Sequence, residues 1–577
     1  MKNFSCRLIS ALLLTFVHIY SQNVLPPRYS FMQANYINTV FINNGIYNYD
    51  WWTFTTKDAG FIWPVTSSQR MTADYTTGIY ILAKVNGQLR AAGSYYSSHF
   101  TGGFIPVPGE VPPVTVCMDS AFKVYLVSVT DQSLVNGGTR TVTAGGRQYT
   151  LNFTSWAGWP VNQGAPYYEV NNIPGYQPGW NSDRPNIGNG SSAKPDQLLF
   201  TVYMDYTNCT NNLHQAEIGL PGGTLPTGAE IQQIAFAFSC YPLQNMYFIK
   251  YRIINKSSMN WDSTYIGLIN DADIGAGSCG AVDDAGGCDS VRNMSFVYNA
   301  DNSDCNYGVN PPALGSRMLQ SPIRFTGNPL DTAKLPYGIY IGYKLIGMTS
   351  SFTFKCGYPC LCEPNDAEEA YYVMRGLNTC GNPYINPVTG LPTKFVYSGN
   401  SCSRTGWIDS VPGDRKYLMN SGPFSMAALD TQIVVFSLMI SRDGSDNFDN
   451  VCKLQTISDS ALKYYYNDFQ TCIPIGIQPI STEVPDRFML YQNNPNPFNP
   501  VTTIRFAVPS VGQRHAFDVQ LVIYDVLGRE IAALVNEELN PGTYEVEWLA
   551  ESYPSGVYFY TISSGNYYDS KKMLLIK

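Results

Sequence analysis

Histidine is scarce in this sequence, with four among 577 residues. His18 lies close to the N-terminus and His515 close to the C-terminus, so a catalytic pair with serine or cysteine would have to use His99 or His214. The patterns H-E-x-x-H and G-x-S-x-G are absent, which removes support for the common zinc-protease and serine-esterase chemistries. We therefore expect His99 and His214 to be surface or packing residues.

Charge is also sparse, since Asp, Glu, Lys and Arg make up 14% of the chain, and the net charge is −8. No basic run occurs, which argues against nucleic acid as a partner. Beyond the N-terminus there is no run of about 18 apolar residues, so no transmembrane helix is predicted. The abundant residues are Tyr (42), Gly (49) and Pro (37), and aromatics between frequent turn residues favour sheet over helix.

The first residues, "MKNFSCRLISALLLTFVHIYSQ", predict a signal peptide over residues 1–21. Lys2 and Arg7 supply the positive end, the apolar centre is too short to span a bilayer, and the small Ser21 suits cleavage. Of fourteen cysteines, Cys6 would leave with this segment, so thirteen remain. In an oxidising compartment we expect disulfides, with at least one cysteine left over. "CGYPCLC", residues 356–362, also suggests a metal site, but no histidine is near and the spacing is not that of a zinc finger.

The body is predicted to be a mainly β, multi-domain structure with a few inserted helices. Residues 22–165 are predicted to form an N-terminal β domain, and "KVNGQL" to close a hairpin at Asn86-Gly87. Residues 166–472 are predicted to form a large β-sandwich-like domain with acidic loops. Two helices are expected there, in "NDAEEAYYVMRG", capped by Asn365, and in "NVCKLQTISDSALKYYYNDF". The proline-punctuated residues 473–486 are predicted to be a linker.

The C-terminal part, residues 487–577, alternates apolar and polar residues strictly. In "TYEVEW", residues 543–548, Tyr544, Val546 and Trp548 share one face, and "DVQLVIYD" does the same. Period-two alternation of this kind predicts strands with one buried face, and about seven short strands fit a small, immunoglobulin-like β-sandwich.

The same part contains, in order, "YQNNPNPFNPVTTIRF", "VIYDVLGREIAALVNEELNPGTYEVEW", "SGVYFYTI" and "KKMLLIK". These segments closely resemble the type A C-terminal sorting domain of type IX secretion cargo. The resemblance implies a Gram-negative bacterium of the Bacteroidota, Chlorobi or Ignavibacteria kind. It also implies passage across the outer membrane directed by residues 487–577, followed by tail cleavage and release or attachment to surface lipopolysaccharide. The implied location is extracellular or the outer cell surface.

The body carries a second, looser resemblance. Segments such as "GLINDADIG" and "SGPFSMAALDTQIVVFSLMIS" look like those of large uncharacterised surface proteins with the same tail, and no known activity comes with them.

An acidic, glycine-rich stretch, "NDADIGAGSCGAVDDAGGCDS", followed by "NADNSD", is the strongest candidate for chemistry. Ca²⁺ takes about six to eight oxygen ligands in flexible geometry, and such a stretch can wrap around one ion. A solvated acidic loop is the alternative, because aspartate also stabilises turns. A second acidic loop holds Asp443, Asp446 and Asp449. The predicted Ca²⁺ ligands are Asp271, Asp273, Asp283, Asp284, Asp289, Asn299, Asp301 and Asp304.

Two functions are compatible with these features. The first is a non-catalytic binding or structural, adhesin-like module stabilised by calcium, with glycans as candidate ligands of the aromatic residues Trp51, Trp52, Tyr176 and Trp180. The second is a secreted polysaccharide-degrading hydrolase, which needs only two carboxylates at the right separation. A carboxylate pair on the floor of an aromatic-lined cleft would favour the hydrolase, and acids gathered around a cation would favour the module.

Overall fold

The computed structural model describes residues 28–576 apart from 51–57, 169–183, 207–208, 211, 241, 276–281, 470–477, 482–484, 510–516, 540, 551–552 and 566. The chain divides into two compact units, of which the first comprises Met1–Phe238 and Pro242–Thr471 and the second Ser239–Tyr241 and Cys472–Lys577. The prediction of a mainly β chain with few helices is confirmed. The predicted signal peptide and the aromatic residues Trp51, Trp52, Tyr176 and Trp180 lie outside the described residues.

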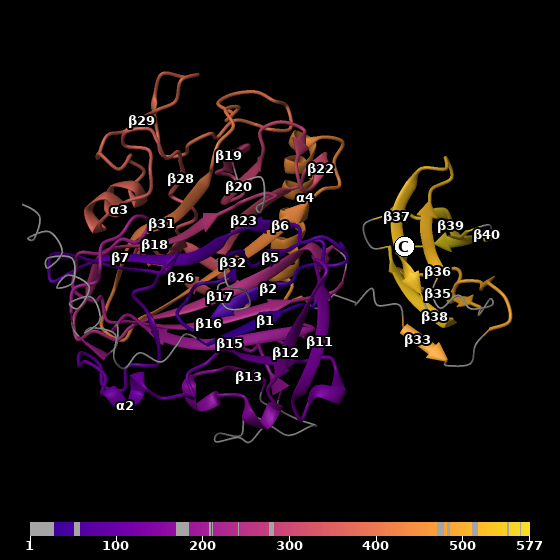
Figure 1. Cartoon of the computed structure of the whole chain (residues 1–577), viewed down its shortest axis with the longest axis horizontal. Helices are drawn as coiled ribbons and strands as arrows, with labels where there is room; N and C mark the ends of the chain where they lie inside the picture. Colours follow the sequence, from indigo (N-terminus) through magenta and orange to yellow (C-terminus); the bar gives the residue numbers. More distant parts are fainter. Residues whose placement is uncertain are drawn as a thin grey trace, which may run out of the picture. The chain divides into compact units, whose positions relative to one another are not determined.

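The first unit, hereafter the body, is built on an eleven-stranded sheet (Figure 1). Its strands follow the order β11 (Gly138–Ala144), β12 (Arg147–Phe153), β10 (Tyr125–Ser128), β15 (Gln197–Met204), β16 (Ala229–Ala237), β17 (Met246–Asn255), β32 (Thr431–Ser441), β23 (Ala313–Gln320), β20 (Met294–Asn299) and β19 (Asp284–Asp289), with β9 (Thr101–Gly102) beside β15. Every pair is antiparallel except β10 with β12. Residues 22–165 and 166–472, which the sequence suggests as two domains, therefore contribute strands to one sheet.

A five-stranded sheet lies against this one, in the order β28 (Ser350–Phe354), β31 (Lys416–Met426), β18 (Trp261–Asp271), β7 (Thr76–Val85) and β8 (Gln88–Gly93). The turn between β7 and β8 is formed by Asn86 and Gly87, both with positive φ (52° and 77°), as the Asn-Gly pair predicts. The remaining short strands pair in twos: β1 (Tyr29–Met32) with β2 (Thr39–Ile42), β3 (Tyr49–Asp50) with β4 (Asp58–Ala59), β5 (Phe61–Ile62) with β6 (Thr72–Asp74), β13 (Tyr167–Tyr168) with β14 (Arg184–Pro185), β21 (Ser303–Asp304) with β22 (Gly308–Val309), β24 (Ile323–Phe325) with β27 (Tyr343–Leu345), β25 (Thr332–Leu335) with β26 (Gly338–Ile341), and β29 (Tyr384–Ile385) with β30 (Pro392–Thr393).

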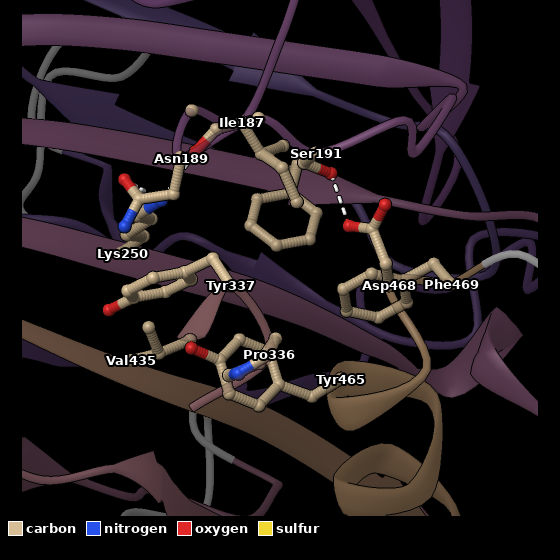
Figure 2. Close-up of a pocket in the computed structure, with 13 residues that line it drawn as sticks. Ile187, Asn189, Ser191, Lys250, Pro336, Tyr337, Val435, Tyr465, Asp468 and Phe469 are labelled. Atoms are coloured by element: carbon tan, nitrogen blue, oxygen red, sulfur yellow. Dashed lines mark hydrogen bonds between the residues drawn. The ribbon is translucent and has the colours of Figure 1, made fainter. Parts of the chain in front are cut away.

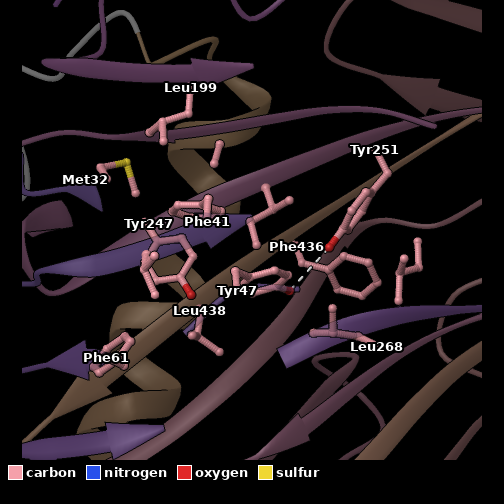
Figure 3. Packing of buried hydrophobic residues seen from close by; sticks show 14 of the residues in the cluster. Met32, Phe41, Tyr47, Phe61, Leu199, Tyr247, Tyr251, Leu268, Phe436 and Leu438 are labelled. Atoms are coloured by element: carbon pink, nitrogen blue, oxygen red, sulfur yellow. Dashed lines mark hydrogen bonds between the residues drawn. The ribbon is translucent and has the colours of Figure 1, made fainter. Parts of the chain in front are cut away.

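The main core fills the space between the two large sheets. Leu268 from β18 belongs to the same buried cluster as Tyr251 and Phe436 from the larger sheet, and Figure 3 shows these side chains converging. Alternation along β31 divides its side chains between two cores, because Tyr417 points into this cluster while Leu418 packs with α3 (Ala367–Met374) on the other face. The body is thus a sandwich of two sheets, with α3 on the outer face of the smaller sheet.

The longer helices begin at aspartate caps. The Asp366 side chain accepts hydrogen bonds from the backbone N–H groups of Glu368 and Glu369, so Asp366 caps α3 where the sequence suggested Asn365. Helix α4 (Asn447–Tyr466) is capped by Asp446. The four-residue helix α2 (Val114–Cys117) completes the α-helices of the described residues.

The second unit consists of two four-stranded sheets that enclose a separate core. One sheet is ordered β33 (Gln478–Ser481), β38 (Gly542–Leu549), β35 (Val501–Val508), β34 (Met489–Leu490), and the other β37 (Glu530–Leu539), β36 (Phe517–Tyr524), β39 (Gly556–Ser564), β40 (Tyr567–Leu575). The alternating side chains Val546 and Trp548 are buried in this core as predicted. Residues 478–481, within the predicted linker, form β33 and pair with β38.

The "NPNPFNP" motif is attached to the last strand of this unit. The backbone N–H of Phe498 donates to the carbonyl oxygen of Leu574 at 3.0 Å, and the N–H of Leu574 donates to Asn496 Oδ1 at 2.9 Å. The Phe498 ring is buried in the core. The motif therefore joins the beginning of the second unit to the segment "KKMLLIK".

Candidate functional site

An acidic site forms where the last residue of β18 lies beside the first residue of β31. The antiparallel register pairs Asp271 with Lys416, so two residues further on Asp273 comes opposite Asp414. Carboxylate oxygens of Asp271, Asp273 and Asp414 lie within 4.8 Å of one another. This spacing allows one cation to bind all three side chains.

The neighbouring hairpin adds further oxygens. Asp284 begins β19 and stands opposite Asn299 at the end of β20. The Asp284 carboxylate accepts a hydrogen bond from the N–H of Ile274, which follows Asp273, at 3.3 Å. The charges of Asp273, Asp283 and Asp304 also act on Asp284. We name this group the acidic cluster; its members are Asp271, Asp273, Asp283, Asp284, Asn299, Asp304 and Asp414.

Several polar atoms of the acidic cluster are buried and lack a hydrogen-bond partner among the described residues. They include one carboxylate oxygen each of Asp271, Asp283 and Asp284, and both amide atoms of Asn299. Asp284 and Asn299 are fully buried, and Asp271 is 3% exposed. Buried polar atoms are nearly always satisfied in native proteins, so the concentration of these atoms sets the acidic cluster apart within the described core.

Burial, and after it the crowding of carboxylates, raises the pKa of the acidic side chains in this cluster. Burial raises the pKa of Asp271 to about 7, although Lys416 opposes the shift. Burial and then the charges of Asp271 and Asp414 raise the pKa of Asp273 well above its usual range. Burial and then Asp273, Asp283 and Asp304 do the same to the pKa of Asp284. The anionic forms of these side chains thus need a positive charge nearby.

One ammonium group partly meets this need. Lys416 Nζ lies 3.2 Å from Asp414 and 2.8 Å from Glu363. Although burial opposes its charge, the surrounding carboxylates raise the pKa of Lys416, so it stays protonated. Among the described residues, Lys416 is the ion-pair partner of the acidic cluster, and it leaves most of the carboxylates without a counter-charge.

Two of the predicted ligands lie outside the acidic cluster. The Asp289 carboxylate is paired with Arg292 at 2.8 Å. Asp301 is exposed and accepts a hydrogen bond from the N–H of Ser303 at 2.9 Å. Both serve as turn-stabilising aspartates, which is the alternative that the sequence left open.

The second acidic loop is occupied by helix-capping contacts. Asp446 accepts a hydrogen bond from the N–H of Asp449 and is paired with Arg404, and Asp449 accepts from the N–H of Ser445 at 2.8 Å. These contacts hold the first turn of α4.

Asp414 was not predicted from the sequence. It is separated from Asp273 by 141 positions, and only the pairing of β18 with β31 brings the two together. The signal in the sequence was slight: an aspartate two residues before the first residue of a strand.

The two histidines of the body are stacked and buried. Their ring centroids are 4.3 Å apart. Both ring nitrogens of His214 face backbone carbonyl oxygens, of Ala91 at 2.6 Å and of Asp205 at 2.7 Å. His99 contacts the carbonyl of Gln215 at 2.8 Å, and burial lowers its pKa to about 3. Both rings are tied to the backbone, which agrees with the expected packing role.

The cysteines of "CGYPCLC" form disulfides, Cys356 with Cys362 and Cys360 with Cys380. Although Cys356, Cys362 and Glu363 lie close together, disulfide sulfurs are not thiolate ligands, so this group does not constitute a metal site. Further bonds join Cys117 to Cys209 and Cys402 to Cys452, and Cys240 and Cys305 are also disulfide-bonded. Cys288 is the buried free cysteine. The prediction of disulfides is confirmed.

A separate pocket of about 330 Å³ lies at the end of α4 (Figure 2). Its lining includes a single carboxylate, that of Asp468, the amine of Lys250 and several aromatic rings. None of the residues that line it belongs to the acidic cluster.

Together these features define a disulfide-bonded β-sandwich body followed by a separate C-terminal β unit. Residues 494–577 match the family described as the secretion system C-terminal sorting domain. The chain therefore carries the sorting tail of a type IX secretion cargo protein, which directs it to the outer surface or the extracellular space. None of the described helices is long and apolar enough to cross a membrane.

No curated protein matches the chain. One solved structure that does match is described as a polysaccharide lyase, with 8% sequence identity and a TM-score of 0.16. The match covers 83% of this chain and 46% of that one, so this chain spans about half the length of that protein. A TM-score this low does not establish a common fold.

Proposed function

We propose that the exported body is a non-catalytic binding or structural module, adhesin-like in role. In this proposal a calcium ion at the acidic cluster stabilises the packing of its two large sheets. The supporting observation is the set of buried, unpartnered oxygens of Asp271, Asp283, Asp284 and Asn299 beside the convergent carboxylates of Asp273 and Asp414. All of these are hard oxygen donors, which Ca²⁺ prefers. A buried group of carboxylates with one ammonium group is stable in its ionised form when a divalent cation is added.

A hydrolase is the weaker candidate. Its chemistry needs two carboxylates about 5–10 Å apart beside a bound sugar. The described pocket with aromatic walls holds one carboxylate, while the acidic cluster is formed by other residues. The arrangement thus favours the module, and no described feature specifically favours hydrolysis.

Export delivers this module to the cell exterior. After passage, we propose that the tail is cleaved and that the body is released or attached to surface lipopolysaccharide, with glycans as its candidate ligands. A glycan array probed with the mature chain, with and without calcium, tests the binding role. Calcium-dependent binding supports the proposal, and release of reducing ends from a bound polysaccharide would overturn it in favour of the hydrolase.

Calorimetric titration of the mature chain with Ca²⁺ tests the metal site. We expect saturable binding that falls at least about tenfold in Asp273→Asn and Asp414→Asn, each of which removes one charged ligand. Asp289→Asn and Asp301→Asn are matched controls, because these acids come from the same stretch but lie outside the acidic cluster. Equal affinity in all four variants would contradict the proposed site.

A further inference from the structure

The pocket at the end of α4 is bounded by segments that are distant in sequence. The loop 187–191 forms one side, and Pro336 and Tyr337, in the turn between β25 and β26, form another. Lys250 of β17 and Val435 of β32 line its floor, with Asp468 beyond α4 at the opposite end (Figure 2). Gly190 on its rim is exposed, so the pocket opens to solvent there.

Lys250 brings a cationic group into this pocket from the middle of a sheet. Its side chain is 6% exposed, and Nζ donates hydrogen bonds to the carbonyl oxygen of Ile187 at 2.7 Å and to Asn189 Oδ1 at 3.1 Å. No described carboxylate lies within ion-pair distance of it. Two of the three ammonium hydrogens are thus used, and the remaining one has no partner in the described chain.

The opposite end of the pocket holds a carboxylate, that of Asp468, which already accepts hydrogen bonds from the protein. The Asp468 carboxylate accepts hydrogen bonds from the hydroxyl of Ser191 and from the backbone N–H of Ser192, the latter at 2.7 Å. Its outward lone pairs can accept from a ligand hydroxyl. A pocket with a donor at one end and an acceptor at the other suits a molecule that carries both kinds of group.

Aromatic rings supply the walls between these ends. The Tyr337 ring centroid is 5.9 Å from Lys250 Nζ, and the Tyr337 hydroxyl contacts Gln320, which fixes the ring. Phe236, Phe469 and Tyr465 form the other sides. Flat apolar faces of this kind pack against the C–H faces of a ring. The volume of about 330 Å³ lies at the lower end of the range for small-molecule sites, about 300–1,000 Å³.

We propose that this pocket binds a carboxylated, hydroxylated ring of monosaccharide size, an acidic sugar unit, with its carboxylate at Lys250, its ring against Tyr337 and its hydroxyls at Asp468 and Ser191. A singly charged carboxylate suits the pocket better than a phosphate, because the nearby Asp468 would repel the second negative charge. The proposal rests on residues separate from the acidic cluster and is independent of the calcium site.

Burial lowers the pKa of Lys250 to about 7; the charge of Asp468 opposes this shift and that of Arg252 adds to it. A bound carboxylate would stabilise the ammonium form, so binding near neutral pH should be accompanied by proton uptake and should strengthen as the pH falls.

Ligand-observed NMR and calorimetry of the mature chain with D-galacturonate and D-glucuronate test the proposal. We expect millimolar or tighter binding of at least one uronate, at least about tenfold tighter than the corresponding neutral sugar, and tighter at about pH 6 than at about pH 8. Lys250→Met and Asn189→Asp should each weaken uronate binding at least about tenfold, the first by removing the cation and the second by placing a competing carboxylate beside it. Asn189 is exposed, so its substitution gives a second test that keeps Lys250 and the core unchanged.

Lys334→Met is the matched control, since Lys334 is an exposed lysine of β25, and it should bind uronates like the unaltered chain. Asp273→Asn should also bind normally, which separates this pocket from calcium-bridged binding at the acidic cluster. Equal affinity for uronates and neutral sugars, unchanged binding in Asn189→Asp, or no binding of either uronate at millimolar concentration would overturn the proposal.

Discussion

Calcium is expected to stabilise the body, and to do so more strongly as the pH rises from about 5 to about 8. The folded pKa of Asp271 is about 7, above the ordinary value of 3.8, so the metal-free fold binds a proton that the unfolded chain has released. Its contribution to stability is therefore present below about pH 4 and is lost as the pH rises to about 7, which amounts to about 4 kcal/mol for this group alone. A bound cation replaces the proton and removes this loss.

The expected size of the effect follows from mass action. At a calcium concentration of about 100 times Kd, the folded state gains about 2.7 kcal/mol. Unfolding entropy of about 2.1 cal/mol/K per residue gives about 0.9 kcal/mol/K for a body of about 440 residues, so Tm should rise by about 3 °C. At about pH 5 the protonated carboxylates compete with the metal, and the shift should be smaller.

Differential scanning fluorimetry of the mature chain in EDTA or millimolar calcium, at several pH values, measures this shift directly. Asp414→Asn should reduce it, while Asp289→Asn should leave it unchanged. A shift that does not depend on pH, or one that is equally large in Asp414→Asn, would refute the assignment of calcium to the acidic cluster.

Further outcomes are expected for export, the cysteines, Lys250 and the C-terminal unit. Deletion of residues 487–577 should leave the protein in the periplasm on cell fractionation, because it removes the sorting domain; normal surface delivery would refute its role. Mass spectrometry of the non-reduced mature chain should find that Cys288 is alkylated only after unfolding. In urea unfolding, the free energy of unfolding of the double variant Cys402→Ser/Cys452→Ser should fall by about 4 kcal/mol, because that disulfide closes a loop of 50 residues. Lys250→Met should gain stability at about pH 7, because a buried lysine whose pKa falls from 10.5 to about 7 destabilises the fold by about 5 kcal/mol at that pH. The loss of two hydrogen bonds offsets about 2 kcal/mol of this gain. A gain that does not shrink as the pH rises toward about 10 would contradict this reasoning. Trp548→Ala should destabilise the C-terminal unit by about 3–5 kcal/mol while leaving the calcium-dependent transition of the body unchanged, and a change in that transition would contradict the division into two units.

Local patterns in the sequence predicted local structure well. Alternation placed Val546 and Trp548 in the core of the C-terminal unit, and Asn86-Gly87 closed a hairpin. These features depend on neighbours a few residues away, so the information needed to predict them lies within one segment. The same applies to α4, whose apolar spacing is visible along the chain.

Features that depend on the pairing of distant strands could not be predicted in this way. Asp414 joins Asp273 only because β31 pairs with β18, and residues 22–165 join the larger sheet because β9 and β10 pair with β15. Within the acidic stretch, Asp289 and Asp284 look alike in sequence, yet Arg292 pairs with the first while the second is buried beside Asn299. Residue type therefore predicted which stretch of sequence is acidic, while the tertiary structure determines which of its side chains belong to the acidic cluster.

The central claim, that the acidic cluster binds a calcium ion, is tested most directly by anomalous diffraction from crystals of the mature chain grown with calcium and then exchanged into terbium, which takes the same oxygen ligands. We predict an anomalous peak between the carboxylates of Asp271, Asp273 and Asp414. A map without a peak at this position, with the ion bound elsewhere or not at all, would contradict the claim.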